Sequence, residues 1–209
     1  MTAVATTGEV SPFRSNRSSP AEREGKREAL LLAAVTMFNE RGFHAASLED
    51  VAASVGVTKP VIYHYLGNKD QVLFECVRIG LQELRDAAAA AQLEAGSGIE
   101  RLEAFLRRYS VTIMGAFGQC VIRTGDEVLS LGARAQFRAL KRQIDDDLRR
   151  AIEDAVEDGS ARVGDVRMTA LAFSGALNWA ARWYRADGAA TPEELAQGLV
   201  GVLINGIRP

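Results

Sequence analysis

The sequence predicts an all-α protein. Apolar residues recur at spacings of three and four through most of the chain, and no stretch alternates apolar and polar residues as a half-buried strand does. Helix-capping signals punctuate these stretches, most clearly in Thr191-Pro192-Glu193-Glu194, where a cap, a first-turn proline and a capping-box glutamate coincide. We therefore expect helices throughout, in a small N-terminal three-helix domain and a larger C-terminal helical domain.

The first twenty residues are expected to form a disordered arm. Residues 1–20 are rich in Ser, Thr, Gly and Pro and hold few large apolar side chains. Arg14 and Arg17 make the end of this arm basic, against the single acid Glu9. The arm is either a solvated leader or a flexible segment that touches nucleic-acid phosphates.

The first helix is expected from Ala21 to Arg41, with Gly42 as its stop signal. A short second helix opens at Ser47 with the capping box Ser47-x-x-Asp50 and is broken by Gly56.

Thr58 is expected to cap a third helix, in which Pro60 lies in the first turn and Ile62 and Leu66 face inward. A further helix follows the capping box Asn68-x-x-Gln71. Beyond it, periodic stretches predict helices over residues 99–113, 137–156 and 165–185, and a last one after Thr191.

Residues 47–66 have the outline of a helix-turn-helix, since two short helices flank a glycine-containing turn. A DNA major groove admits one α-helix, and a second helix braced across the backbone fixes its angle. No acidic residue lies between Ser54 and Asn68, as a phosphate-facing surface requires. The alternative is a tight helical hairpin whose tyrosines pack on their neighbours.

Composition limits the function classes. The chain has 209 residues, 47% of them hydrophobic and 25% charged, with a formal net charge of -2, so a nucleic-acid site must be a local patch. Cys76 and Cys120 lie far apart without a CxxC pair, so we expect reduced core thiols, no metal site and no resident cofactor. No apolar run is long enough for a membrane span and no signal-peptide core is visible, so we expect a cytoplasmic protein without a membrane partner.

An enzyme is not expected. The chain has no phosphate-binding glycine loop, no HExxH and no Gly-x-Ser-x-Gly elbow. His44 and His64 have no plausible base or metal partner nearby in the sequence. A ligand-independent architectural DNA-binding protein remains an alternative to a regulated one.

The stretch ERGFHAASLEDVAASVGVTKPVIYHYLGNKDQVL resembles the DNA-binding domain of the TetR family of bacterial transcription regulators. The resemblance implies a repressor that binds a palindromic DNA operator as a homodimer and is released by a small-molecule effector. It implies a DNA-binding domain over residues 21–75 and a ligand-binding and dimerisation domain over residues 76–209. The family commonly has Phe where this chain has Leu66. The DNA contacts carried over from the family are Ser47, Thr58, Lys59, Pro60, Val61, Tyr63, His64, Tyr65 and Lys69.

The C-terminal run GALNWAARWYRADGAATPEELAQGLVGVLINGI resembles a subgroup of that family, the regulators of fatty-acid and related acyl-CoA metabolism. This resemblance implies an acyl-CoA effector, with an aromatic or multidrug compound as the alternative. An acyl chain needs an apolar tunnel and its CoA needs cations at the mouth, although the same residues are also compatible with plain core and salt-bridged surface. The candidates are Phe105, Tyr109, Met114, Phe117, Arg123, Asn178, Trp179, Arg182 and Trp183, with Arg134 and Arg138 as further cations.

Small residues in the last two helices favour close packing across a two-fold axis. The alternative is ordinary core within one chain. The candidate interface residues are Leu171, Gly175, Leu199, Val202 and Leu203.

Overall fold

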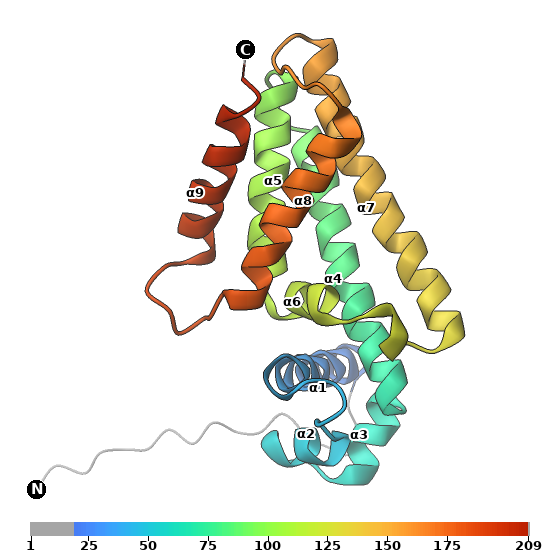
Figure 1. The fold of residues 1–209 in the computed structure, drawn as a ribbon. Coiled ribbons are helices and arrows are strands. Elements are labelled where there is room, and N and C mark those ends of the chain that lie inside the picture. Colours follow the sequence, from blue (N-terminus) through green and yellow to red (C-terminus); the bar gives the residue numbers. More distant parts are fainter. Residues whose placement is uncertain (1–18, 209) are drawn as a thin grey trace, which may run out of the picture. The chain divides into compact units, whose positions relative to one another are not determined.

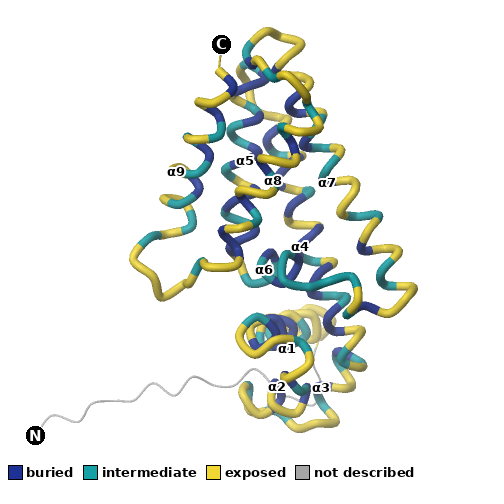
Figure 2. The backbone as a smooth tube through the Cα atoms, in the orientation of Figure 1, coloured by how far each residue is buried: buried dark blue, intermediate teal, exposed yellow. Residues whose placement is uncertain are grey.

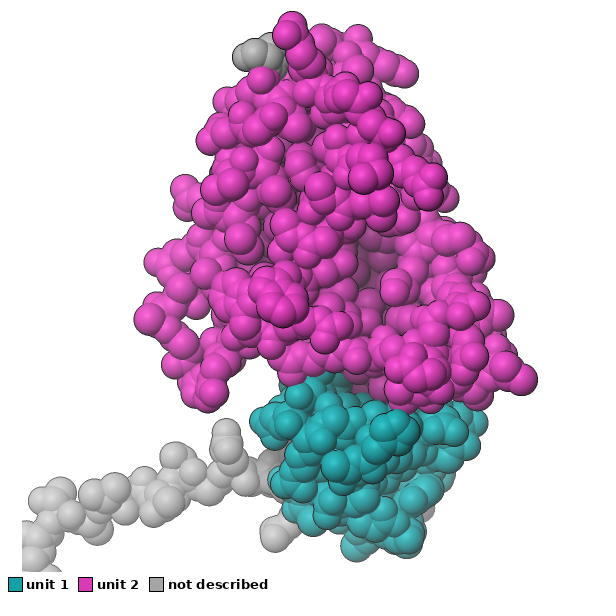
Figure 3. All heavy atoms as spheres, in the orientation of Figure 1, with its two compact units in different colours: residues 1–72 teal, residues 73–209 magenta. Residues whose placement is uncertain are grey.

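The computed structural model describes residues 19–208, and this part of the chain holds nine α-helices, one short 3-10 helix and no strand (Figure 1). The all-α prediction is confirmed. The chain divides into two compact units, Met1–Val72 and Leu73–Pro209 (Figure 3). None of the described helices has the length and apolarity that a membrane crossing needs.

The N-terminal unit contains α1 (Pro20–Arg41), α2 (Leu48–Ser54) and α3 (Lys59–Leu66), which pack against one another, and the start of α4 (Lys69–Gln92). Ile62 and Leu66 of α3 are buried, as their spacing predicts. Gly56 and Gly67 adopt φ values of 69° and 75°, a left-handed backbone that glycine allows at these two turns.

Two residues of the expected arm, Ser19 and Pro20, belong to the start of α1. Ser19 is the N-cap of α1, because its side chain accepts a hydrogen bond from the Glu22 amide and the Glu22 carboxylate accepts one from Ser19 N. Pro20 occupies the first turn, where its missing N–H costs little. The rest of the arm, with Arg14 and Arg17, lies outside the described residues.

The other expected caps differ in detail. Asn68 and Gln71 form the full reciprocal box, with both hydrogen bonds at 2.9 Å. At α2 only half of the box forms: Ser47 Oγ accepts from the Asp50 amide, while the Asp50 carboxylate lies 3.8 Å from Arg41. Thr58 is the N-cap of α3 by its backbone, but its side chain makes no capping hydrogen bond.

The C-terminal unit is built around α5 (Gly98–Met114). This helix packs against α6 (Ala116–Arg123), α7 (Leu131–Glu157), α8 (Val166–Trp183) and α9 (Pro192–Asn205). Burial along α5 follows from this central position (Figure 2), and Leu102, Leu106 and Ile113 are essentially inaccessible to solvent. The 3-10 helix η1 (Asp126–Val128) links α6 to α7.

Helix α6 and η1 were not among the elements predicted from the sequence. The segment Ala116–Arg123 is only eight residues long, and its N-cap, Gly115, lacks the side-chain cap that marks the start of α2. Gly118 lies against the backbone of α5, where an added Cβ would come within 2.1 Å of the Thr112 carbonyl oxygen. The close approach of α6 to α5 therefore depends on a residue without a side chain.

The N-terminus of α5 is held by the loop that follows α7. The Gly98 amide donates to the Asp158 carboxylate at 2.5 Å, and the Ile99 amide donates to Ser160 Oγ at 2.9 Å. These bonds satisfy amide groups that a helix leaves free at its start. Hydrogen bonds from Ser160 and Gly98 lower the pKa of the Asp158 carboxyl.

Gly98 gives a direct test of this packing. A Cβ at Gly98 would lie 2.5 Å from Ala155 Cα, so Gly98→Ala should lower the free energy of unfolding by about 1–3 kcal/mol. Gly132→Ala in α7 is the matched control, since that position is open and alanine should stabilise a helix there by up to about 1 kcal/mol. Urea unfolding followed by circular dichroism measures both, and equal midpoints would contradict the packing described for α5.

Candidate functional site

Helix α3 presents a polar and aromatic surface from a fixed base. Ile62 is fully buried and Leu66 nearly so, which anchors one side of the helix in the N-terminal unit. Thr58 and the outward positions of α3 are exposed or half-buried: Lys59, Pro60, Val61, Tyr63, His64 and Tyr65. A short helix held in this way can project its outer face as a rigid surface.

A carboxylate from α2 lies within this surface. Glu49 Oε1 is 2.5 Å from Lys59 Nζ and accepts a hydrogen bond from the Tyr63 hydroxyl at 3.3 Å. Lys59 Nζ also lies 5.6 Å from the centre of the Tyr63 ring. The hydrogen bond between Lys59 and Glu49 lowers the pKa of the Glu49 carboxyl and raises that of the Lys59 ammonium group.

This contact corrects the expectation of an acid-free surface. Residues 54–68 indeed carry no acid, but the fold brings in Glu49 from the neighbouring helix. A count of charges along one segment cannot include a residue that reaches the same surface from another segment.

Lys69 and Ser47 are held by local contacts. Lys69 Nζ donates to the His44 carbonyl oxygen at 3.3 Å and lies 4.4 Å from the centre of the Phe43 ring. Ser47 Oγ is engaged as the cap of α2. The Lys69 ammonium group is thus placed beside the turn that follows α1.

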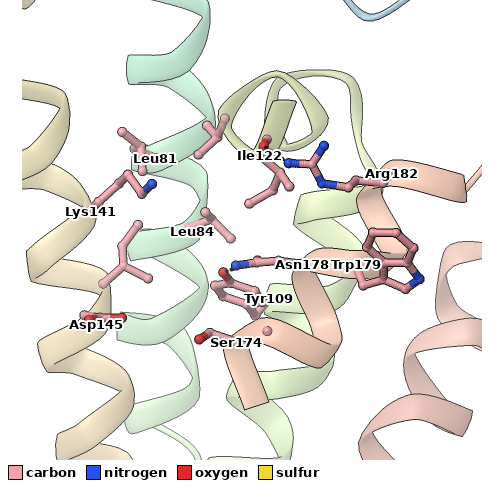
Figure 4. A pocket seen from close by; sticks show the side chains of 13 residues that line it. Leu81, Leu84, Tyr109, Ile122, Lys141, Asp145, Ser174, Asn178, Trp179 and Arg182 are labelled. Carbon is pink, nitrogen blue, oxygen red and sulfur yellow. Dashed lines mark hydrogen bonds between the residues drawn. The ribbon is translucent and has the colours of Figure 1, made fainter. Parts of the chain in front are cut away.

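The C-terminal unit contains a cavity of about 290 Å³ (Figure 4). Its aliphatic side chains come from α4, α6 and α7, Trp179 comes from α8, and its polar groups come from α5, α7 and α8. The lining residues are Leu81, Leu84, Tyr109, Val121, Ile122, Lys141, Ile144, Asp145, Ser174, Gly175, Asn178, Trp179 and Arg182.

Tyr109 and Asn178 form a hydrogen bond at the wall of this cavity. The buried Tyr109 hydroxyl donates to Asn178 Oδ1 at 2.7 Å, which joins α5 to α8. Burial raises the pKa of the Tyr109 hydroxyl well above its usual range, so this group stays protonated and remains a donor. The bond fixes the orientation of the Asn178 amide.

The cavity brings together only part of the candidate set from the sequence. Tyr109, Asn178, Trp179 and Arg182 line it, although Trp179 is 64% exposed. The sequence reasoning missed the ionic residues Lys141 and Asp145, which are four apart on one face of α7 and could have been found by that spacing.

The other candidates lie elsewhere. Phe105 is core and its ring meets the Tyr109 ring edge-on, and Met114 packs with Ala180 and Ala196. Phe117 and Trp183 are absent from the residues that line the cavity.

The candidate arginines mostly bind backbone or carboxylate groups. Arg123 donates to the Ala181 carbonyl oxygen at 3.1 Å, and Arg182 donates to the Ile122 carbonyl oxygen at 3.4 Å, so each binds the end of the other's helix. Burial and the neighbouring Arg182 lower the pKa of the Arg123 guanidinium. Arg134 donates to the Leu129 carbonyl oxygen, and Arg138 pairs with Asp126.

Helices α8 and α9 expose apolar side chains in this single chain. Met168, Leu171 and Trp183 on α8 are 61%, 47% and 46% exposed, and Val202 on α9 is 75% exposed. An added Cβ would meet no atom within 4 Å at Gly175, Gly198 or Gly201, so these helix faces are open. Leu199 and Leu203 are half-buried, and Leu199 packs against the core.

These features define a helix-turn-helix protein that also has a cavity-bearing helical unit. Residues 30–76 match the family described as bacterial regulatory proteins, tetR family, and residues 95–207 match the tetracyclin repressor-like C-terminal domain. The chain belongs to the TetR family and is a DNA-binding transcription regulator.

Several named regulators are similar to this chain over 84% to 88% of its length. The HTH-type transcriptional repressor KstR2 of Rhodococcus jostii is 29% identical over 195 residues, covering 88% of this chain and 92% of the relative. The structure of PfmR, a TetR family regulator from Thermus thermophilus, is 29% identical with a TM-score of 0.76 and covers 84% of this chain and 97% of that one. The structure of AibR in complex with isovaleryl coenzyme A and operator DNA is 28% identical with a TM-score of 0.74 and covers 86% of this chain and 98% of that one.

Glu49→Gln should strengthen DNA binding. The change frees the Lys59 ammonium group and removes a carboxylate that phosphates repel. A mixed-sequence duplex offers Lys59 no specific base contact, so the freed ammonium group should bind a phosphate there, and the slope of log affinity against log salt should steepen by about 0.9. Fluorescence anisotropy with a short mixed-sequence duplex at several salt concentrations measures this slope. Asp50→Asn is the matched control, because it removes the same charge one residue away without touching Lys59. Equal slopes for the two variants would mean that Lys59 does not bind phosphate.

Proposed function

We propose that this chain is a homodimeric transcriptional repressor that binds a palindromic operator and is released by an acyl-CoA. Residues 21–75 would bind DNA, and residues 76–209 would bind the effector and the second copy. The observation that carries the proposal is the outer face of α3, held by the buried Ile62 and Leu66, in a chain that also holds a cavity in its C-terminal unit. DNA as the partner implies action in the cytoplasm, and catalysis is no part of the proposal.

Within this proposal α3 is the recognition helix. Lys59, Val61 and His64 would contact base edges in the major groove, with Val61 against an apolar group such as a thymine methyl. Tyr63, Tyr65 and Lys69 would contact phosphates, because each carries a hydroxyl or ammonium donor on α3 or just after it. Thr58, Pro60 and Ser47 complete the predicted contact set.

The exposed faces of α8 and α9 support a dimer. A recognition helix of eight residues makes too few contacts for a specific site, and two copies bind two half-sites. The open glycines let a second helix approach closely, and the exposed Leu171 and Val202 offer apolar area to bury. We assign Leu171, Gly175, Leu199, Val202 and Leu203 to this interface.

An acyl-CoA effector is supported by the cavity and by one relative. AibR binds isovaleryl coenzyme A and operator DNA in a structure whose fold this chain shares. The cavity of about 290 Å³ lies near the lower end of small-molecule sites, about 300 Å³, so it would take the acyl part alone. Arg182 lines it and would lie near the anionic CoA.

Release from DNA tests the effector. The full chain is bound to a labelled duplex from the region upstream of its own gene, and CoA thioesters of increasing length are added. We expect a short acyl-CoA to lower the DNA affinity at least about fivefold, a typical coupling between two sites. Free CoA is the control for non-specific competition by the anion. Release by an aromatic compound but by no thioester would contradict the acyl-CoA assignment and leave the regulator in place.

Val202→Glu tests the dimer. Val202 is 75% exposed in the single chain, so the change should leave folding intact while burying a charge at the proposed interface. Light scattering should then report a monomer, and operator affinity should fall at least about tenfold because one half-site contact is lost. Leu131→Glu, at an 82% exposed position on α7, is the control and should stay dimeric. Dimeric Val202→Glu with full DNA binding would place the interface elsewhere.

A further inference from the structure

We infer that the acyl group entering this cavity is short and carries, beyond the thioester, an oxygen that accepts hydrogen bonds from Asn178 and Lys141. The inference rests on the proposed function and narrows it from acyl-CoA in general to the thioesters of short oxo or carboxy acids. The inference also differs from the expectation drawn from the sequence, in which the acyl chain lies in an apolar tunnel.

The size of the cavity sets the length. About 290 Å³ is near the lower limit of small-molecule sites, and the aliphatic part of the lining is limited to Leu81, Leu84, Val121, Ile122 and Ile144, with Trp179 as a further large apolar side chain. A long saturated chain would need more apolar area for its burial than these side chains offer.

Asn178 supplies a fixed donor. Tyr109 occupies Asn178 Oδ1 with a hydrogen bond of 2.7 Å, which leaves the amide nitrogen as the remaining polar group of that side chain. Across residues 19–208, no hydrogen bond takes up this nitrogen. Asn178 is half-buried at the cavity wall, and a plain alkyl group placed there would remove water from the amide without replacing its hydrogen bond.

Lys141 supplies a cation on the opposite side, from α7 (Figure 4). Its ammonium group lies 5.1 Å from the centre of the Phe137 ring, and within the described part of the chain it forms no ion pair. The acid that shares the cavity, Asp145, is already paired with Arg149 at 3.1 Å. The lining therefore favours an oxygen with negative charge or a strong carbonyl dipole over a cationic or purely apolar group.

Ser174 lies in the same lining but cannot act as such a donor. Its hydroxyl donates to the Leu171 carbonyl oxygen at 3.3 Å within α8. A carbonyl oxygen of the ligand would gain nothing from this hydroxyl, so Ser174 is a matched control for Asn178 on the same helix.

Two thioesters that differ by one oxygen test the inference. Titration calorimetry on the full-length chain compares butanoyl-CoA with 3-oxobutanoyl-CoA, and hexadecanoyl-CoA tests length. We expect 3-oxobutanoyl-CoA to bind at least about tenfold more tightly than butanoyl-CoA, because the cavity donors remain unpaired with the latter. Hexadecanoyl-CoA should bind more weakly than both.

Variants identify the donors. Asn178→Leu keeps the shape of the side chain and should abolish the preference for the oxo compound, and Lys141→Met, at an exposed position, should reduce it without affecting folding. Ser174→Ala should retain the preference. Thermal melting of each variant reports whether it is folded. If Asn178→Leu does not fold, the loss of preference in Lys141→Met alone tests the inference.

The outcomes separate this inference from the proposed function. If butanoyl-CoA or hexadecanoyl-CoA binds as tightly as 3-oxobutanoyl-CoA and releases DNA, the inference is overturned and the acyl-CoA-responsive repressor stands. If no thioester binds or releases DNA, both fail. A preference that persists in Asn178→Leu and Lys141→Met overturns the assignment to these donors.

Discussion

The central position of α5 is the constraint on which the larger unit depends. When a helix packs against four others, water cannot reach its buried polar groups to form hydrogen bonds with them, either at its ends or along its length. Its first amides are therefore bound by Asp158 and Ser160, and its start approaches α7 so closely that only Gly98 fits. Its buried tyrosine, Tyr109, needs a partner for the same reason and finds it in Asn178.

The polar character of the cavity follows from the hydrogen bond between Tyr109 and Asn178. The Tyr109–Asn178 bond fixes a polar group among apolar walls, where an unpaired amide is costly and a matched oxygen is favourable. Lys141 adds a charge at the opposite wall. Under the proposed function, such a cavity would select a ligand by where its oxygen lies as well as by its size, which a purely apolar tunnel cannot do.

In the N-terminal unit the constraint is different, because long polar side chains on an exposed surface are held in place by contacts within the unit. Glu49 holds Lys59 and Tyr63, and the turn after α1 holds Lys69. These contacts order the side chains, and under the proposed function they would be exchanged for phosphate or base contacts on binding. Exposed ion pairs contribute little to stability, so the exchange is easily reversed.

The sequence by itself determined the features that depend on neighbours three or four residues apart. The reciprocal caps at Asn68 and Thr191 and the inward pair Ile62 and Leu66 are of this kind, because a helix brings such residues onto one face.

Tertiary structure alone decided what meets across the chain: Glu49 beside Lys59, Asn178 on Tyr109, and Lys141 facing the cavity. Sequence spacing correctly predicted that the aromatic candidates Phe105 and Trp183 lie on helices. It could not predict that neither of them lines the cavity. The physical reason is that periodicity specifies which face of a helix is buried, whereas the packing of several helices determines which buried face encloses space.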